Sequence, residues 1–300
     1  MGVWPLFAIP TLIWGSTWFA IKFQLGVVAP EVSVAYRFAA AALLLAAWCA
    51  ATGRSLALPR RAHAWMALQG VTMFGLNYVA VYEAEQRLAS GLVAVVFSTI
   101  VFMTPFGARA AFGTPVAART LAGAVLGVAG IALLFLPELR AAGAGGANAV
   151  GVAFAIASPL IAAVGNLVSM RMQRDALPVL TSTAWGMGYG ALAVAAVATA
   201  GGAAWTLDVR PPYLLSLAYL AVFGSIVAFA TYLTLLQRVG PGPSSFVGVA
   251  TPVVAMLFTT VFEGYRWTWV GALGIALAAV GNVIALRPAA RDAGLPKRAR

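Results

Sequence analysis

The chain has 300 residues, of which 62% are hydrophobic and only 9% are charged. Soluble domains are about 45–50% apolar and about 25% charged, so this composition excludes a soluble enzyme, a secreted disulfide scaffold and a disordered chain. The net charge of +11 would suit nucleic acid, but the basic residues lie in short loops and at the C-terminus. We therefore expect no nucleic-acid partner. One cysteine, Cys49, and one histidine, His63, predict no disulfide framework, no metal site and no cofactor.

Apolar runs of about twenty residues, each long enough to cross a hydrocarbon core of about 30 Å as a helix, recur along the whole chain. The first run starts almost at Met1 without a basic leader, which favours a retained helix over a signal peptide. The runs and the breakers between them predict an all-α integral membrane protein with ten spans in the lipid bilayer. The predicted spans are 3–21, 32–51, 64–82, 89–108, 117–136, 149–170, 179–200, 212–236, 243–262 and 268–286.

The distribution of charge predicts the orientation of these spans. If the N-terminus is cytoplasmic, most of the basic residues fall in inner loops or in the C-terminal tail, as the positive-inside rule requires. An even number of spans then places both termini in the cytoplasm. Lys22, Glu31 and Arg37 flank the first outer loop, where snorkelling to the interface explains them. Glu83, Glu85 and Glu263 are likewise expected at the outer surface.

An internal repeat divides the chain in two. A shift of 151 residues places Gln86-Arg87 on Gln237-Arg238, Gly123 on Gly274 and Gly130 on Gly281. Each half holds five spans, and because five is odd the second half enters the membrane from the opposite side. Inverted repeats of this kind are typical of secondary transporters, which bind substrate near the midplane between the halves. The chance alternative is a coincidence of glycines in a glycine-rich chain.

The repeat predicts a domain organisation of two five-helix units and a tail. The first unit covers 1–140 and the second covers 149–287, and residues 288–300 form a basic cytoplasmic tail. Residues 141–148, which are small and uncharged, are expected to link the units. Glycines of the fifth and tenth spans predict close helix contacts, either within the bundle or between the copies of a homodimer, so we expect a monomer or a homodimer.

Polar and aromatic residues inside the predicted spans are the candidates for substrate binding. Trp14 and Trp18 are four residues apart in the first span and share a face, and Ser16 adds a hydroxyl. In the third span Tyr78 and Tyr82 continue a stripe from Phe74, with Asn77 beside it. A buried Asn in hydrocarbon requires a partner, which is either a neighbouring helix or a substrate. The other candidates at mid-depth are Ser98, Asn166, Tyr232 and Phe246.

Several kinds of chemistry are missing from the predicted spans. No Asp or Glu lies near the middle of a span, which argues against an acidic proton or sodium relay and favours facilitated diffusion or exchange. No Gly-Lys-Ser/Thr phosphate loop occurs, which excludes ATP-driven transport by this chain alone. His63 lies in a basic loop and Cys49 near the end of a span, so the chain is not expected to be an enzyme.

Taken together, these motifs resemble the EamA branch of the drug/metabolite transporter superfamily. The resemblance rests on Trp14-Gly15-Ser16-Thr17, on Tyr36-Arg37-Phe38 and on the glycine-rich helix that closes each half, and it covers nearly all of the chain. It implies ten helices around a central cavity and the export of small metabolites from bacteria, and the chain is most similar to exporters of amino acids, including aromatic ones. The second half has the family's Thr251-Pro252 and Phe262-Glu263, whereas the first half lacks their counterparts.

We therefore expect a secondary transporter of the bacterial inner membrane that exports a small-molecule substrate by alternating access. Aromatic walls would contact the apolar part of the solute, and amides and hydroxyls would bind its polar ends. The expected substrates are amino acids, aromatic or otherwise neutral. Purines, sugars and cationic drugs remain alternatives, because aromatic rings also bind ammonium groups through cation–π contacts.

Overall fold

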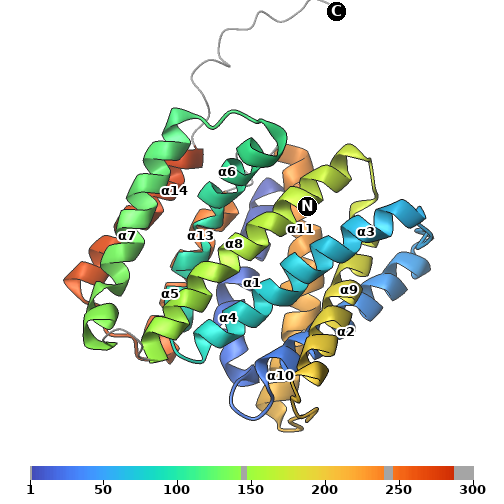
Figure 1. Ribbon diagram of the computed structural model, residues 1–300, viewed down its shortest axis with the longest axis horizontal. Coiled ribbons are helices and arrows are strands. Elements are labelled where there is room, and N and C mark those ends of the chain that lie inside the picture. The colour runs from blue at the N-terminus through green and yellow to red at the C-terminus, as the bar shows by residue number, and fades with distance from the viewer. Residues whose placement is uncertain (1, 143–146, 240–245, 287–300) are drawn as a thin grey trace, which may run out of the picture.

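The structure is a computed structural model that describes residues 2–142, 147–239 and 246–286, and the helices of these ranges form ten spans (Figure 1). Seven spans are single α-helices and three are composite. The single helices are α1 (Val3–Ile21), α2 (Pro30–Ala51), α7 (Ala118–Ala142), α8 (Ala147–Arg174), α9 (Val179–Ala200), α13 (Phe246–Phe262) and α14 (Trp269–Leu286). The composite spans are α3 (Arg60–Gln69) with η2 (Gly70–Leu76) and α4 (Asn77–Glu85), α5 (Ser90–Phe97) with α6 (Ile100–Phe112), and α10 (Pro211–Tyr219) with η3 (Leu220–Val227) and α11 (Ala228–Val239).

Six of these helical segments are long and apolar enough to cross a membrane, and three shorter apolar helices lie at 118–134, 247–262 and 269–285. The prediction of an all-helical membrane protein is therefore confirmed. The predicted fifth span 117–136 is too short, because α7 continues through Pro137 to Ala142. Both ends of the predicted linker 141–148 are helical, because α7 ends at Ala142 and α8 begins at Ala147. Residues 143–146 lie outside the described residues. The basic tail 288–300 and the start of the predicted ninth span also lie outside them.

The helices pack in a pattern that is unchanged when the two halves are exchanged. The second spans of the halves, α2 and α9, pack on each other, and so do the fifth spans, α7 and α14. The first span α1 packs on α13 and α11 of the other half, as its counterpart α8 packs on α6 and α4. Figure 1 shows α7 and α14 side by side at one end of the molecule and α2 and α9 at the other.

Glycine contacts between α7 and α14 fix the relative direction of the halves. A Cβ on Gly130 would lie 2.5 Å from the carbonyl oxygen of Gly274, and a Cβ on Gly281 would lie 2.5 Å from that of Gly123. Early residues of α7 therefore meet late residues of α14, so these equivalent helices run antiparallel. Since Gly123 corresponds to Gly274 and Gly130 to Gly281, the two contacts are copies of each other. The repeats are inverted, and the glycines pack within the bundle.

The third span of each half contains a π-helical turn at an equivalent position. One turn, η2, begins at Gly70 and packs on α9, and the other, η3, begins at Leu220 and packs on α2. A π-turn shifts the backbone hydrogen bonds by one residue and re-aims the side chains and carbonyls beside it. In η3 the hydroxyl of Ser225 donates to the carbonyl of Leu220, 3.0 Å away and five residues earlier. The paired turns place Phe74 and Gly224 in the interior of the bundle.

Candidate substrate-binding site

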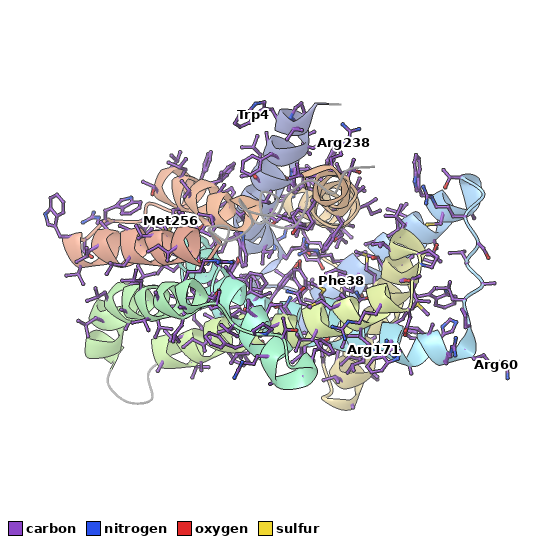
Figure 2. All side chains as sticks on the ribbon, turned by 90° about the horizontal axis from the view of Figure 1, so that it is seen from above. Trp4, Phe38, Arg60, Arg171, Arg238 and Met256 are labelled. Carbon is purple, nitrogen blue, oxygen red and sulfur yellow. The ribbon has the colours of Figure 1, made fainter. Side chains whose placement is uncertain are left out.

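A chain of aromatic rings runs through the interior and is built by both halves. The ring centroids of Tyr232 and Trp14 are 5.3 Å apart, and Trp14 is also 5.3 Å from Phe229. Phe229 continues to Phe74 at 6.0 Å. Phe74 in turn lies 5.6 Å from the ring of Phe38, which Figure 2 shows inside the bundle while Trp4 projects from its edge.

The chain of rings ends at a buried guanidinium. The ring of Phe38 is 4.7 Å from that of Tyr78, and the Cζ atom of Arg37 lies 5.1 Å and 4.6 Å from these two ring centroids. Arg37 is only 1% exposed. The expectation that it snorkels to the interface is therefore wrong, because it lies two helical turns, about 10 Å, beyond the start of α2. Among the described residues, its Nε and Nη1 atoms have no hydrogen-bond partner.

A stripe of α4 faces this guanidinium. Tyr78, Tyr82 and Glu85 are spaced four and three residues apart, so they share one face of the helix. Tyr82 is fully buried, and among the described residues its hydroxyl has no hydrogen-bond partner. Glu85 is 1% exposed, so the expectation that it lies at the outer surface is also wrong. Within the part of the chain that the structure describes, neither of its carboxylate oxygens has a hydrogen-bond partner.

The other residues of the first and third spans that the sequence singled out lie close to these rings or pack on the neighbouring helices. The indole of Trp14 donates to the carbonyl of Gly224 in η3 at 3.1 Å, and Ser16 shares a hydrogen bond of 2.6 Å with the hydroxyl of Tyr219. Trp18 is buried against Phe97, with ring centroids 5.4 Å apart. These contacts join α1 to both halves of the bundle.

Asn77 is buried, and its amide donates to the carbonyl of Met73 within its own span at 3.2 Å. Its Oδ1 atom has no partner among the described residues. The amide therefore does not hold two helices together, which was the structural explanation offered for a buried Asn in the third span. A buried amide oxygen without a partner is available to a ligand's donor.

Three predicted site residues lie apart from the aromatic chain or outside the description. Ser98 accepts a hydrogen bond of 2.9 Å from the amide of Asn282 in α14, and the amide of Asn166 donates to Thr104 of α6 at 3.2 Å. Both contacts join neighbouring helices, which is a packing role. The backbone of Phe246 begins α13, but its side chain lies outside the described residues.

A hydrogen-bonded cluster closes the end of the bundle that the charge distribution assigns to the outside. Glu263, at the end of α13, accepts hydrogen bonds from the backbone and hydroxyl of Ser90 and, at 3.0 Å, from Thr259. The Nζ atom of Lys22 lies 3.9 Å from Glu263 and donates to the carbonyls of Glu85 and Leu88 at 2.5 and 2.6 Å. We call these residues, Lys22, Ser90, Thr259 and Glu263, the outer cluster; they connect the two halves.

Two pockets among the described residues lie away from the rings of the aromatic chain. A pocket of about 250 Å³ lies between α2, α4, α8 and α9, with Glu31, Glu83, Leu76 and Phe154 in its walls. A second pocket of about 290 Å³ lies among the outer loops, beside Gly26–Pro30, Gln86 and Thr206. The rings that were expected to line a central cavity are instead in contact with one another, so the candidate site is occluded in this conformation.

Arg37 and Glu85 are the functional candidates that the sequence analysis placed wrongly. Two signals in the sequence could have found them. Arg37 follows the helix-starting Pro30 by seven residues, which is too deep for an interfacial position. Glu85 continues the stripe of Tyr78 and Tyr82 by one more turn. What the sequence could not show is that these two elements face each other.

The fold and the buried site define a multi-helical membrane protein with inverted repeats and a polar, aromatic interior, which is the architecture of a secondary transporter. Comparison with known proteins gives the family. The EamA-like transporter family matches residues 3–136 and 149–287, and the chain belongs to this family. The protein is therefore a membrane transporter and not an enzyme.

Similar proteins indicate the membrane in which this transporter lies. The chain is 30% identical over 281 residues to the uncharacterized inner membrane transporter YedA of Escherichia coli (strain K12), covering 92% of this chain and 88% of YedA. It is 26% identical to Protein PecM of Dickeya dadantii (strain 3937), covering 83% and 80%. A solved crystal structure has the same fold, with a TM-score of 0.68, 20% identity and coverage of 93% and 94%. The protein is thus a multi-pass transporter of the inner membrane.

Proposed function

We propose that this transporter exports neutral amino acids, aromatic ones among them, by alternating access. The observation that carries the proposal is the chain of rings from Tyr232 to Tyr78, to which both halves contribute. An apolar or aromatic side chain gains favourable ring contacts if it separates these rings, and the rings close on each other when it leaves. The buried polar groups at the end of the chain, Arg37 and Asn77, would bind the polar end of the solute.

The contacts between the halves suggest how access would alternate. The ring of Phe74 in the first half meets that of Phe229 in the second, so a rocking motion of one half against the other opens the chain of rings at this contact. The outer cluster closes one end in the present conformation. Opening of that end requires the hydrogen bonds between Ser90 and Glu263 to break. Rigid-body rocking of repeats around a fixed site is a common transport mechanism.

Reconstitution tests this function. Liposomes that contain only this protein are preloaded with a labelled panel of neutral amino acids, a purine, a sugar and a quaternary amine, and release is compared with protein-free liposomes. We expect the amino acids to leave faster than from the empty liposomes and the other solutes to leave at the background rate. Release of only the other solutes, or of none of the panel, would overturn the proposal.

A pair of tryptophans in α1 supplies a matched variant and control. Trp14 lies in the chain of rings, whereas Trp4 is 81% exposed at the edge of the bundle (Figure 2). Trp14→Ala is expected to lower amino-acid release by tenfold or more, and Trp4→Ala is expected to leave it unchanged. Equal rates in the two variants, both monodisperse in detergent, would show that the rings do not form the pathway.

A further inference from the structure

A buried basic side chain and a buried acidic side chain lie at the end of the chain of rings. Arg37 on α2 and Glu85 on α4 are each 1% exposed, and the Cζ atom of Arg37 lies 4.6 Å from the ring centroid of Tyr78, which shares a face of α4 with Glu85. Yet no ion pair with a nitrogen–oxygen distance of 4.0 Å or less joins them. Buried charges are expensive unless they are paired and hydrogen-bonded. Two such groups without an ion pair between them each require a partner, and a single ligand head that carries both signs would supply both.

The unused hydrogen-bonding atoms match such a group. Nε and Nη1 of Arg37 are donors without a partner among the described residues, and both carboxylate oxygens of Glu85 are acceptors without one. A guanidinium presents its donors in a planar fork that fits a carboxylate, and a carboxylate accepts from an ammonium group. The hydroxyl of Tyr82, on the same helix face as Glu85, also has no hydrogen-bond partner among the described residues.

Glu263 and Lys22 lie near Glu85, but neither forms a hydrogen bond with its carboxylate. Glu263 accepts its hydrogen bonds from Ser90 and Thr259 of the outer cluster. Lys22 donates to the main-chain carbonyl of Glu85, and its ion-pair partner is Glu263 at 3.9 Å. The carboxylate oxygens of Glu85 therefore stay without hydrogen bonds among the residues that the structure describes.

We propose that Arg37 and Glu85 form a dipolar site that recognises the zwitterionic head of an α-amino acid, with the carboxylate on Arg37 and the ammonium group on Glu85. The side chain of the amino acid then points along Phe38 and Tyr78 into the chain of rings. This inference rests on the proposed function and narrows its substrates to zwitterionic amino acids. It excludes solutes that carry only one charge, such as quaternary amines, and solutes that carry none, such as sugars.

Competition in the unmodified protein tests the site without any variant. Uptake of the amino acid that moves in the reconstituted system is measured against two analogues, one without the carboxylate and one without the ammonium group. For L-phenylalanine these are phenethylamine and 3-phenylpropionate. Each lost group leaves a buried charge unpaired, so we expect each analogue to compete roughly ten- to a hundredfold more weakly than the amino acid. An analogue that competes as well as the amino acid would overturn the proposal.

Variants then assign each charge to its group. Arg37→Gln removes the group that binds the carboxylate of the substrate, so the analogue without a carboxylate, phenethylamine, should compete as well as the amino acid. Glu85→Gln removes the group that binds the ammonium, so the analogue without it, 3-phenylpropionate, should compete as well as the amino acid. If Arg37 and Glu85 had only a structural role, the variants would lower transport without changing how well each analogue competes relative to the amino acid. An unchanged ratio of competition therefore overturns the assignment. If a single variant fails to fold, Arg37→Gln with Glu85→Gln removes both charges together, and both preferences should disappear.

The neighbouring pair of Arg87 and Glu83 is a matched control. These residues carry the same charges at the end of α4, Glu83 in its last turn and Arg87 directly after it, but they pair with each other at 2.6 Å and are partly exposed. Arg87→Gln and Glu83→Gln should leave the competition ratios unchanged. If no amino acid moves at all, the proposed function fails; if amino acids move but the analogues compete equally, only the dipolar site fails.

Discussion

Asn77 and Asn282 are both buried amides, and they use their donors differently. The Nδ2 atom of Asn282 donates to Ser98 on another helix at 2.9 Å, whereas that of Asn77 donates to Met73 of its own span at 3.2 Å. A hydrogen bond between helices stabilises their packing, but one within a span does not join it to another helix. The same residue type therefore has a packing role in one position and is a candidate for binding in the other.

This difference gives a prediction at the residue scale. Asn77→Leu should lower amino-acid release by tenfold or more and leave the unfolding temperature in detergent nearly unchanged, because its amide joins no second helix and donates only to Met73 of its own span. Asn282→Leu breaks a contact between helices. It should lower the unfolding temperature, with a decrease of about 1 kcal/mol in the free energy of unfolding. Measurements of thermal unfolding and release on both variants separate the two roles. A loss of stability in Asn77→Leu equal to that in Asn282→Leu would contradict the interpretation.

Individual residues also show how far the sequence can be interpreted. The stripe of Phe74, Tyr78 and Tyr82 was predicted from its spacing, because helical periodicity is a local property. The burial of Arg37 was not, because it depends on which helices cover the outer end of α2. The rule that charges near a span end snorkel holds for a helix that faces lipid. Arg37 instead faces Tyr78 and the π-turn at Gly224.

At the scale of elements, the contact between α7 and α14 depends on glycines that have no room for a side chain. A Cβ on Gly130 would lie 2.5 Å from the carbonyl oxygen of Gly274 and 2.7 Å from the backbone nitrogen of Ala278. Both neighbours are backbone atoms, so the helices themselves must separate to accept a methyl group. Close backbone approach at small residues is a principal source of helix association in membranes.

Gly130→Ala is therefore expected to destabilise the protein by about 1–3 kcal/mol through overpacking. Gly188→Ala in α9 is the control, because its Cβ would meet only the Cβ of Ala42 at an ordinary 3.8 Å. That variant should be neutral or more stable by about 0.4–1 kcal/mol, since alanine restricts the unfolded chain. Thermal unfolding in detergent measures both. An equally stable Gly130→Ala would show that α7 and α14 are not tightly packed.

The ten spans could be predicted because each is an apolar run with its own breakers, and their order is confirmed in the structure. The π-turns could not, since η2 and η3 depend on contacts with α9 and α2 that have no local sequence signal. The break between α5 and α6 was also missed. There Ser98 and Thr99 donate to carbonyls three residues earlier, which tightens the turn.

The two ends of the whole molecule are closed by different chemistry. At the predicted outer end, the outer cluster joins the halves through an acidic side chain, Glu263. The counterpart of Glu263 in the first half is Phe112, and at the predicted inner end the guanidinium of Arg174 lies 4.5 Å from its ring centroid. A carboxylate with several hydrogen bonds holds more strongly than a cation–π contact of about 0.5–1 kcal/mol at an exposed site.

Removal of this carboxylate should loosen the outer end selectively. In Glu263→Ala, hydrogen exchange of the amides of Ser90 and Gly91 should become at least tenfold faster, because Ser90 loses its acceptor and Thr259, which accepts from Gly91, loses a partner. Amides near Phe112 should exchange as before. Glu83→Ala, which removes the same charge at the same end outside the cluster, is the control. Unchanged exchange at Ser90 would show that the cluster does not close the protein.

The self-matching contacts between α7 and α14 have a consequence for the transport cycle. If the halves exchange their conformations to expose the site to the other side, every contact turns into that of its repeat counterpart. The contact between Gly123 and Gly281 turns into that between Gly274 and Gly130, which is already present. This helix pair can therefore stay still as a fulcrum during the cycle. The helix pairs α1 with α13 and α8 with α6 are equivalent, but their residue contacts differ: Gly15 of α1 meets Val254, whereas its counterpart Asn166 of α8 donates to Thr104. These are the surfaces that must slide.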